Sequence, residues 1–192
     1  MGNKFIIRKT CSIYASDVHF ATMVFPFVSK KLMEKSIVRT ILETNMKPNI
    51  LKIINNIGLD ENQKNQIKNI DWDRSNIRKI KQILGELEKD IKKENNTDII
   101  VCGSNTFIEK VNKVIDLWTK NNMEELEKSN CIINIINCYS FEENNKNKSI
   151  INSYNYILKT AGIEEIYTEE LKEANWWLTI FYLCYILKTY KR

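Results

Sequence analysis

The chain has 192 residues, of which 43% are hydrophobic and 28% charged, and its formal net charge is +5. This length and composition are typical of one full-sized globular domain and leave little room for a second. Lys and Arg are interspersed with Asp and Glu along most of the chain, so the basic excess is diffuse and does not predict a nucleic-acid-binding face.

The cysteine and histidine content argues against a metal site. The chain has five cysteines, none in a C-x-x-C pair, and a single histidine, His19. Zinc sites built from Cys and His need several such ligands at short spacing, so we expect no metal and no resident cofactor. Most of the cysteines lie in or beside apolar runs, and the N-terminus lacks the apolar region of a signal peptide. This predicts a cytoplasmic protein with reduced thiols.

The first half of the chain alternates strand-like apolar runs with helical patterns. It predicts, in order, a strand, a helix, a second strand and a second helix: 4–14, 20–35, 36–44 and 47–58. Pro26 falls inside the first helical pattern, where we expect it to kink the helix or restart a turn. Pro48 suits the first turn of the second helix, and Gly58 suits its C-terminal end.

The second half continues this alternation. Residues 65–73 are a weaker strand candidate, and the clearest helical pattern follows at 75–96, with Ser75 as its N-cap. The remaining pattern predicts a strand, a helix, a strand, a polar loop and a helix closed by Gly162: 97–103, 107–118, 130–141, 140–149 and 148–162.

Strands separated by helices indicate β-α-β units. The near-continuous apolar runs "IIV" and "CIINII" are typical of strands buried on both faces. We therefore expect a three-layer α/β domain with a mostly parallel central sheet of about five strands and helices on both faces, RecA- or Rossmann-like. The expected division is an α/β domain over 1–165 and a C-terminal helical extension over 166–192.

The C-terminal run from Trp176 to Leu187 is almost continuously apolar. As a helix it would span roughly 18 Å, against about 30 Å for the hydrocarbon core of a bilayer, so no transmembrane segment is expected. We expect a helix that packs into the core or on a partner, including a second copy of the chain. Its partner-binding candidates are Trp176, Trp177, Ile180, Phe181, Cys184 and Leu187. A membrane-surface anchor with Lys188, Lys191 and Arg192 at the lipid headgroups is the alternative.

The turn after the first strand lacks a phosphate-binding loop. It reads "YASDVHF" (14–20), with no glycine and no lysine, so the pattern G-x-x-x-x-G-K-[ST] is absent. ATP hydrolysis of the P-loop type is therefore not expected.

Polar residues follow several of the predicted strands. Because the carboxyl ends of parallel strands share one edge of a sheet, and open α/β sheets bind ligands there, this edge is the candidate ligand site. Its predicted members are Ser16, Asp17, His19, Thr44, Cys102, Gly103, Ser104, Asn105 and Tyr139.

Each of these residues also has a structural interpretation. Ser16 or Asp17 can cap the following helix while His19 packs near its first turn, and the pair Ser104-Asn105 can form a turn and a helix cap. A catalytic interpretation uses Asp17 and His19 as an acid/base pair and Cys102 as a nucleophile activated by the next helix.

The order of segments resembles the MEDS family (methanogen/methylotroph DcmR sensory domain). The resemblance rests on "CSIYASDVHFATMVFPFVSKKLMEKSIVRTILET", with its C-x-x-Y strand and Pro-containing helix, on "IIVCGSNTF" and on "MEELEKSNCIINIINCYSFEE". It covers roughly residues 8 to 160. It implies a RecA- or KaiC-like core that has lost the nucleotide-hydrolysing loop, and a sensory role in which ligand binding is relayed to an output domain. This chain carries no recognisable output domain after residue 160, so we expect a signal to leave through a partner protein.

These observations favour a non-enzymatic sensory or regulatory module that binds a small ligand or a partner protein at the carboxyl edge of the sheet. One alternative is an interaction protein that uses the Trp176–Leu187 helix. Another is a small-substrate enzyme that uses Asp17, His19 and Cys102.

Overall fold

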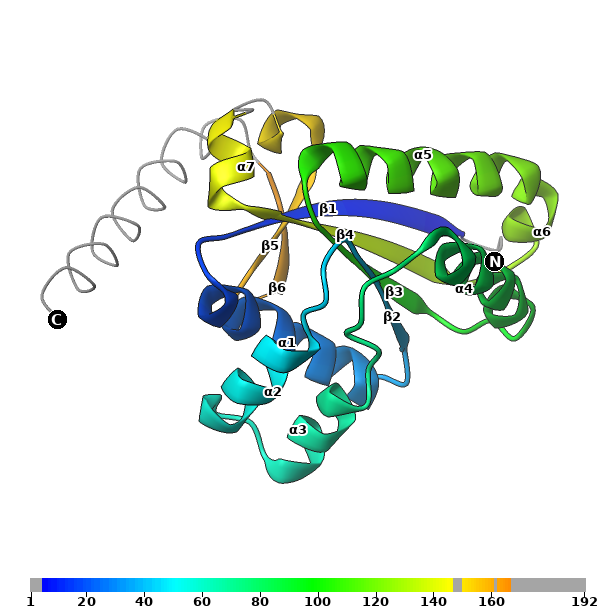
Figure 1. The fold of residues 1–192 in the computed structure, drawn as a ribbon. Helices are drawn as coiled ribbons and strands as arrows, with labels where there is room; N and C mark the ends of the chain where they lie inside the picture. The colour runs from blue at the N-terminus through cyan, green and yellow to red at the C-terminus, as the bar shows by residue number, and fades with distance from the viewer. Residues whose placement is uncertain (1–4, 147–149, 161, 167–192) are drawn as a thin grey trace, which may run out of the picture.

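The computed structural model describes residues 5–146, 150–160 and 162–166. Six strands form one sheet in the order β2-β3-β4-β1-β5-β6 (Figure 1). Their bounds are β1 (Ile6–Tyr14), β2 (Ile37–Leu42), β3 (Thr97–Cys102), β4 (Ile132–Ser140), β5 (Tyr156–Lys159) and β6 (Gly162–Glu165). The first five strands pair in parallel, and β6 pairs antiparallel with β5. The α/β class with a mostly parallel sheet is confirmed, and the described sheet has one strand more than the five expected.

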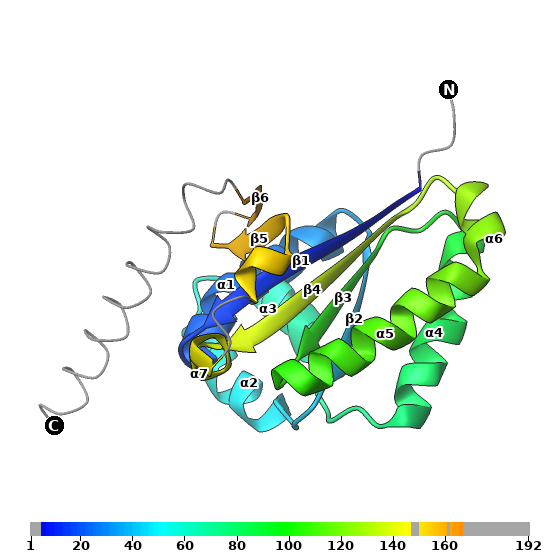
Figure 2. The same ribbon diagram turned by 90° about the horizontal axis from the view of Figure 1, so that it is seen from above.

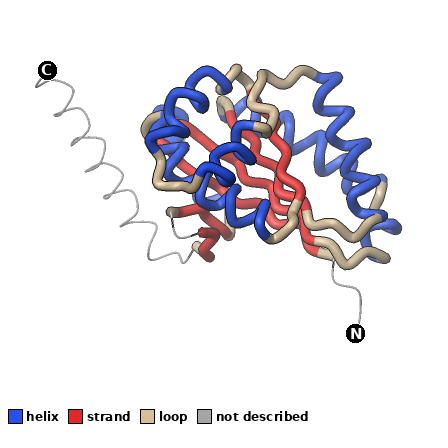
Figure 3. The backbone as a smooth tube through the Cα atoms, turned by 90° about the horizontal axis from the view of Figure 1, so that it is seen from below, coloured by secondary structure: helices blue, strands red, loops and turns tan. Residues whose placement is uncertain are grey.

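Helices cover both faces of the sheet and make three layers (Figures 1 and 2). One face carries α1 (Asp17–Met33), α2 (Lys47–Ile53), the short 3-10 helix η1 (Ile54–Asn56) and α3 (Glu61–Lys68), which stand in front of the sheet in Figure 3. The other face carries α4 (Ile77–Lys92), α5 (Asn105–Asn121) and α6 (Met123–Glu127). After β4 come α7 (Phe141–Lys146) and a second 3-10 helix, η2 (Ile151–Ser153).

The alternation of side chains along β4 divides the core in two. Ile133, Ile135 and Tyr139 pack with α4 and α5, whereas Ile136 and Cys138 pack with α1 and its neighbours. A central strand with an apolar cluster on each face needs apolar residues at successive positions. This is why "CIINII" is apolar at every position except Asn134.

The first helix begins earlier than expected and continues through its proline. Ser16 is the N-cap of α1, and its Oγ accepts a hydrogen bond from the His19 N–H at 3.2 Å. The predicted restart at Pro26 is wrong, because α1 runs as one helix from Asp17 to Met33. The bulky apolar side chains on both sides of Pro26, Phe25 and Phe27, are buried in the core and hold the helix in place.

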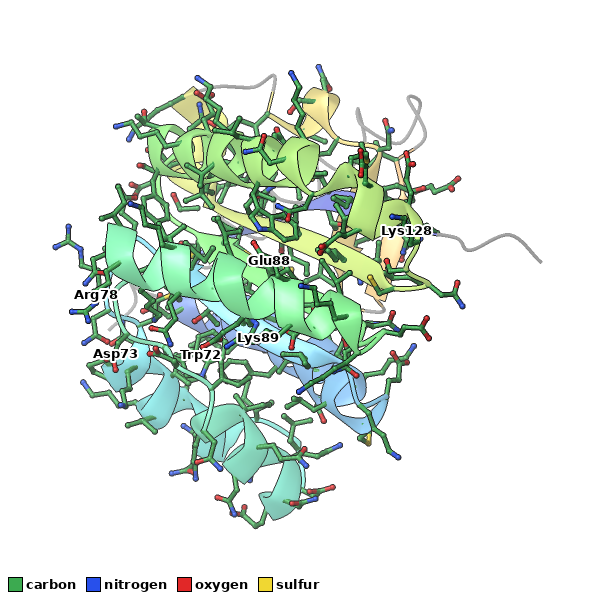
Figure 4. The ribbon with its side chains drawn as sticks, turned by 90° about the vertical axis from the view of Figure 1, so that its right-hand side faces the viewer. Trp72, Asp73, Arg78, Glu88, Lys89 and Lys128 are labelled. Atoms are coloured by element: carbon green, nitrogen blue, oxygen red, sulfur yellow. The ribbon has the colours of Figure 1, made fainter. Side chains whose placement is uncertain are left out.

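The predicted strand at 65–73 is wrong. Residues up to Lys68 belong to α3, which begins with a capping box between Asp60 and Gln63. Trp72 follows the helix in an irregular segment (Figure 4) and is fully buried, and its Nε1–H donates to the carbonyl oxygen of Ile67 at 2.8 Å. The local cap and this indole contact outweigh the weak strand pattern.

The prediction that Ser75 caps α4 is wrong. Asn76 is the N-cap, and its side chain accepts a hydrogen bond from the Lys79 N–H. Ser75 instead binds the outer edge of β2: its N–H donates to the Leu42 carbonyl oxygen, and its Oγ accepts from the Leu42 N–H. The hydroxyl of Thr40 adds a bond to the Asp71 carbonyl oxygen. The segment between α3 and α4 therefore covers backbone groups that an edge strand would otherwise expose.

The region after β4 differs most from the prediction. The expected loop at 140–149 contains α7, and the expected helix at 148–162 is replaced by η2, β5 and β6. β1 has a free edge opposite β4, and β5 pairs with it at Cys11↔Ile157. This long-range pairing overrides the local helical pattern. Gly162 starts β6 with a φ of +127°, which L side chains rarely adopt.

The predicted C-terminal helix and its candidates Trp176 to Leu187 lie outside the described residues. Among the residues that the structure does describe, no helix combines the length and apolar character needed to cross a bilayer.

We predict that Trp72→Ala lowers the free energy of unfolding by about 3–5 kcal/mol, because it empties a large buried site. Urea unfolding followed by circular dichroism measures this change. Ile77→Ala is the matched control: Ile77 is 76% exposed, so its truncation is expected to cost no more than about 0.5 kcal/mol. Equal losses in the two variants would contradict the burial argument.

Candidate functional site

Parallel pairing brings the polar residues after the first four strands to one edge of the sheet. Ser16 and Asp17 follow β1, Thr44 follows β2, Gly103 to Asn105 follow β3, and Tyr139 lies one residue before the end of β4. The expected shared edge is therefore present. The residues do not line one common cavity, however, because they divide between the two faces of the sheet.

Ser16 and Asp17 border a shallow hollow of about 460 Å³ between α1 and α2. The Asp17 carboxylate accepts a hydrogen bond from the Asn49 amide at 2.7 Å, and Lys52 lies at the same hollow. The Asp17–Asn49 hydrogen bond thus joins the start of α1 to α2. Thr44 is exposed and borders none of the cavities described below.

His19 holds the turn between β1 and α1. Its Nδ1 accepts a hydrogen bond from the Ala15 N–H at 3.1 Å, so this nitrogen is unprotonated in the folded chain. Partial burial of the ring lowers its pKa below the ordinary value of 6.5. One ring nitrogen is therefore already used by the backbone and does not face a substrate.

Cys102 is a buried thiol and not an activated one. Its Sγ lies 3.3 Å from the Tyr14 hydroxyl. Burial raises the pKa of Cys102 to about 12, and the nearby Asp17 and Glu43 carboxylates add to this rise. The thiol therefore stays protonated at neutral pH, whereas a nucleophilic cysteine needs a depressed pKa. Asp17, His19 and Cys102 each have a different hydrogen-bond partner: Asn49, Ala15 and Tyr14.

The N-terminus of α5 is occupied by two carboxylates that sequence reasoning missed. Glu43 accepts from the Ser104 N–H at 2.5 Å and from the Ser104 hydroxyl at 3.0 Å. Glu143 accepts from the Asn105 N–H at 3.0 Å. These acids neutralise the helix end that would otherwise attract an anion. Glu43 was detectable as an acid placed directly after β2, but Glu143 lies in the tract that had been expected to be a loop.

Gly103 is required by the close approach of Glu43. A Cβ added at Gly103 would lie 2.7 Å from the Glu43 Cβ and 2.8 Å from a ring carbon of Phe107. The glycine therefore permits the Glu43 carboxylate to reach Ser104. Ser104 also caps α5, since its Oγ accepts from the Phe107 N–H.

Tyr139 belongs to a polar network on the α5 face. Its hydroxyl lies 2.7 Å from the Tyr154 hydroxyl, which also accepts a hydrogen bond from the Asn137 amide at 3.0 Å. Burial raises the pKa of both phenols above the ordinary value of 10.0, so both hydroxyls stay protonated. Asn137 is fully buried, and its Oδ1 has no hydrogen-bond partner among the described residues.

A cavity of about 360 Å³ opens above this network, between α5 and η2. Its lining combines the predicted site residues Asn105 and Tyr139 with residues that were not predicted: Glu109, Asn112, Lys113, Asp116, Ile150, Ser153 and Tyr154. Tyr154 was missed because its segment reads as a helix, and Asn112 because it lies mid-helix on α5. We call this space the tyrosine cavity.

Metal ligands are not grouped in the part of the chain that the structure describes: no three His, Cys, Asp or Glu side chains there could hold an ion together.

Comparison with models of known protein families gives no match, and comparison with curated proteins gives none. The resemblance to the MEDS family therefore stays a prediction from the motifs quoted above.

We predict that Gly103→Ala lowers the free energy of unfolding by about 1–3 kcal/mol, because the new methyl group displaces Glu43 from Ser104. The control is Gly85→Ala in α4, where an added Cβ meets nothing within 4 Å. That variant should be more stable by up to about 1 kcal/mol, since alanine favours a helix over glycine. Chemical denaturation of the two variants measures the change in the free energy of unfolding for each. Equal destabilisation by Gly103→Ala and Gly85→Ala would refute the steric explanation.

The lowered pKa of His19 predicts that the stability of the folded chain depends on pH. Because its pKa is lower in the folded chain than its ordinary value of 6.5, the unfolded chain binds the proton more readily. The contribution of His19 to the free energy of unfolding is therefore complete above pH 6.5. It declines as the pH falls below 6.5 toward the lower pKa of the folded chain. His19→Asn keeps an acceptor for the Ala15 N–H without titrating, so it should flatten the stability profile between roughly pH 5 and 7.

An NMR titration of the single histidine checks the same point directly. We expect a midpoint below 6.5 in the folded protein; a midpoint at or above it would contradict the buried, backbone-bound ring.

Proposed function

We propose that the chain is a non-enzymatic sensory or regulatory module that binds a small, uncharged polar molecule in the tyrosine cavity. The observation that carries this proposal is the unpartnered Oδ1 of Asn137, which is fully buried behind the cavity lining. The Asn137 Nδ2 donates to the Tyr154 hydroxyl, which lines the cavity together with Tyr139, so a ligand has to pass between these side chains to reach Oδ1. Burying an acceptor without a donor costs about 1–3 kcal/mol. A ligand that donates to this oxygen would recover that cost, and would do so only when bound.

The chemistry of the cavity favours a neutral ligand. Two phenol groups, three amides (Asn105, Asn112 and Asn137) and the hydroxyl of Ser153 lie in or directly below it. Its charges largely balance, since Asp116 is paired with Lys9 at 2.6 Å and the lining holds one further acid, Glu109, and one lysine, Lys113. Polar groups placed in a concave, partly apolar lining are what ligand sites use for orientation.

The position of the cavity supports the same proposal. It lies beside the carboxyl-terminal part of β4, whose neighbour β1 sends its chain to the opposite face through α1. Open α/β sheets bind ligands at such points, where successive connections leave on opposite sides. The RecA-like or Rossmann-like assignment and the MEDS resemblance belong to this proposal. They are supported by the interior position of β1 and by a turn after it that has no phosphate-binding glycines.

The sensory role then requires an output. We propose a cytoplasmic setting in which ligand binding orders the cavity wall formed by η2, and the change is passed to a partner protein or a second copy of the chain. The run from Trp176 to Leu187 is the proposed contact segment.

A thermal-shift screen of neutral polar metabolites and nucleosides tests the proposal. A ligand present at about 100 times its dissociation constant stabilises the folded state by about 2.7 kcal/mol, which raises the melting temperature. Tyr154→Phe should weaken binding of any hit by about tenfold or more, because it removes the hydroxyl that joins Asn137 to Tyr139.

Tyr156→Phe is the matched control, since Tyr156 lies on β5 outside the lining of the tyrosine cavity. The proposal fails if no compound stabilises the wild-type chain, or if hits bind the Tyr154→Phe and Tyr156→Phe variants equally well.

A further inference from the structure

A second cavity lies at the opposite end of the strands from the predicted edge. It has a volume of about 320 Å³ and is lined by residues of the second half of α1, the first halves of β1 and β4, and the β5–β6 hairpin. The residues that matter for its chemistry are Arg8, Phe27, Lys30, Lys31 and Asn134. None of them belongs to the site described above.

The floor of this cavity is part of a polar row that crosses the centre of the sheet. Arg8 of β1 is in register with Asn134 of β4, and Asn134 is in register with Asp98 of β3. Asp98 is fully buried, and its carboxylate accepts from the Ser36 hydroxyl at 2.5 Å and from the Asn134 amide at 2.7 Å. Three polar residues side by side in a buried sheet are costly unless their groups are satisfied.

One group in this row is not satisfied. Asn134 is only 5% exposed, and its Oδ1 has no hydrogen-bond partner among the residues described. Its Nδ2 is held by Asp98, which fixes the amide and leaves Oδ1 as a buried acceptor in the lining of the cavity. A donor from outside the described chain would complete it.

Three basic residues, Arg8, Lys30 and Lys31, line the same cavity as this acceptor. The Arg8 guanidinium lies 4.8 Å from the centre of the Tyr156 ring, a stacking contact that orders its donors before any ligand arrives. Lys30 and Lys31 come from the last turn of α1. Lys31 shares its charge with Glu34 at 2.8 Å in a partly exposed pair, and such pairs are weak enough to reorganise.

We propose that this cavity binds a small organic anion that carries a hydroxyl or amino group next to its carboxylate or phosphate. The anionic group contacts Arg8 and Lys30, and the neighbouring hydroxyl or amine donates to Asn134 Oδ1. The buried Asp98 behind Asn134 keeps the ligand's negative charge at the cationic rim and its donor group at the floor. This inference is independent of the tyrosine cavity.

The experiment uses matched pairs of probes: L-malate against succinate, and glycerol 3-phosphate against n-propyl phosphate. Malate differs from succinate by one hydroxyl and glycerol 3-phosphate differs from n-propyl phosphate by two, and the two pairs distinguish a carboxylate from a phosphate ligand. Binding is followed by chemical shift changes of the backbone amides around Asn134 and Gly162 and by calorimetry. We expect the hydroxyl-bearing member of at least one pair to bind about tenfold more tightly than its partner.

Three variants locate the site. Arg8→Gln and Lys30→Gln should each weaken binding severalfold. Lys81→Gln is the control, because it removes the same charge from an exposed position on α4, on the other face of the sheet, and should leave binding unchanged. Lys30 is exposed, so its variant is expected to fold normally even if Arg8→Gln does not.

The proposal is overturned if neither hydroxyl-bearing anion binds, or if malate and succinate, and likewise the two phosphates, bind equally. It is also overturned if Lys81→Gln weakens binding as much as Lys30→Gln, since the effect would then reflect net charge and not this cavity.

Discussion

The parallel pairing of β1 with β4 is the constraint on which the rest of the structure depends. Its register runs without interruption from Ile6↔Ile132 to Tyr14↔Ser140, along the whole of both strands. It places the first strand inside the sheet, between strands that are far away in the sequence. Because the two strands are aligned residue for residue, polar groups on neighbouring strands meet at defined levels. Arg8 meets Asn134 near one end, and the helices α1 and α7, which carry Asp17 and Glu143, begin at the other.

The carboxyl edge is organised by acids of the protein itself. Glu43 and Glu143 bind the backbone of Ser104 and Asn105 at the start of α5, where a phosphate-binding protein would hold its ligand. The hydrogen bond from the Asn105 N–H, followed by that from Lys146, lowers the pKa of Glu143, so this carboxylate remains charged at neutral pH. The edge therefore offers little to an anion at this helix. The buried side-chain atoms without a hydrogen-bond partner among the described residues include Asn137 Oδ1 on one face and Asn134 Oδ1 on the other.

Different side-chain contacts hold the covering segments in place on the two faces of the sheet. On the α4–α5 face, the Trp118 indole donates to Glu88 at 3.3 Å, while Arg39 of β2 binds Glu86 and Asp90 of α4 (Figure 4 labels Glu88). On the other face, Phe20 and Phe25 pack against Trp72 with ring centroids 6.3 and 6.0 Å apart. Aromatic packing of this kind holds the irregular segment after α3 in position. That segment in turn covers the edge of β2.

Sequence patterns were reliable where local periodicity and burial agree. The buried strands around "IIV" and "CIINII" and the amphipathic α4 and α5 appear where their patterns predicted them. The absence of the P-loop motif after the first strand is likewise a direct property of the sequence. Patterns failed where a contact outside the local pattern decides the structure. Trp72 lies in a segment with a strand-like pattern, but its indole donates a hydrogen bond to Ile67 in an irregular segment. Tyr156 lies in a segment with a helical pattern, but this segment forms β5 and pairs with the free edge of β1.

The candidate site was predictable as a location but not as a set of contacts. Parallel strands guarantee that Ser16, Thr44 and Asn105 share an edge, but the face to which each side chain points depends on the turns between strands. Asn105 and Tyr139, both among the residues predicted at this edge, line the tyrosine cavity. Their partner Tyr154 could not be foreseen, because its position depends on η2 and β5, which the local pattern did not indicate.

The central claim is that the buried acceptor of Asn137 is completed by a bound neutral molecule. A high-resolution crystal structure of the chain with its most stabilising compound tests this most directly. The account predicts density for the compound in the tyrosine cavity, with a donor group within hydrogen-bond distance of Asn137 Oδ1. It would be contradicted by a compound bound elsewhere, with ordered water alone satisfying that oxygen.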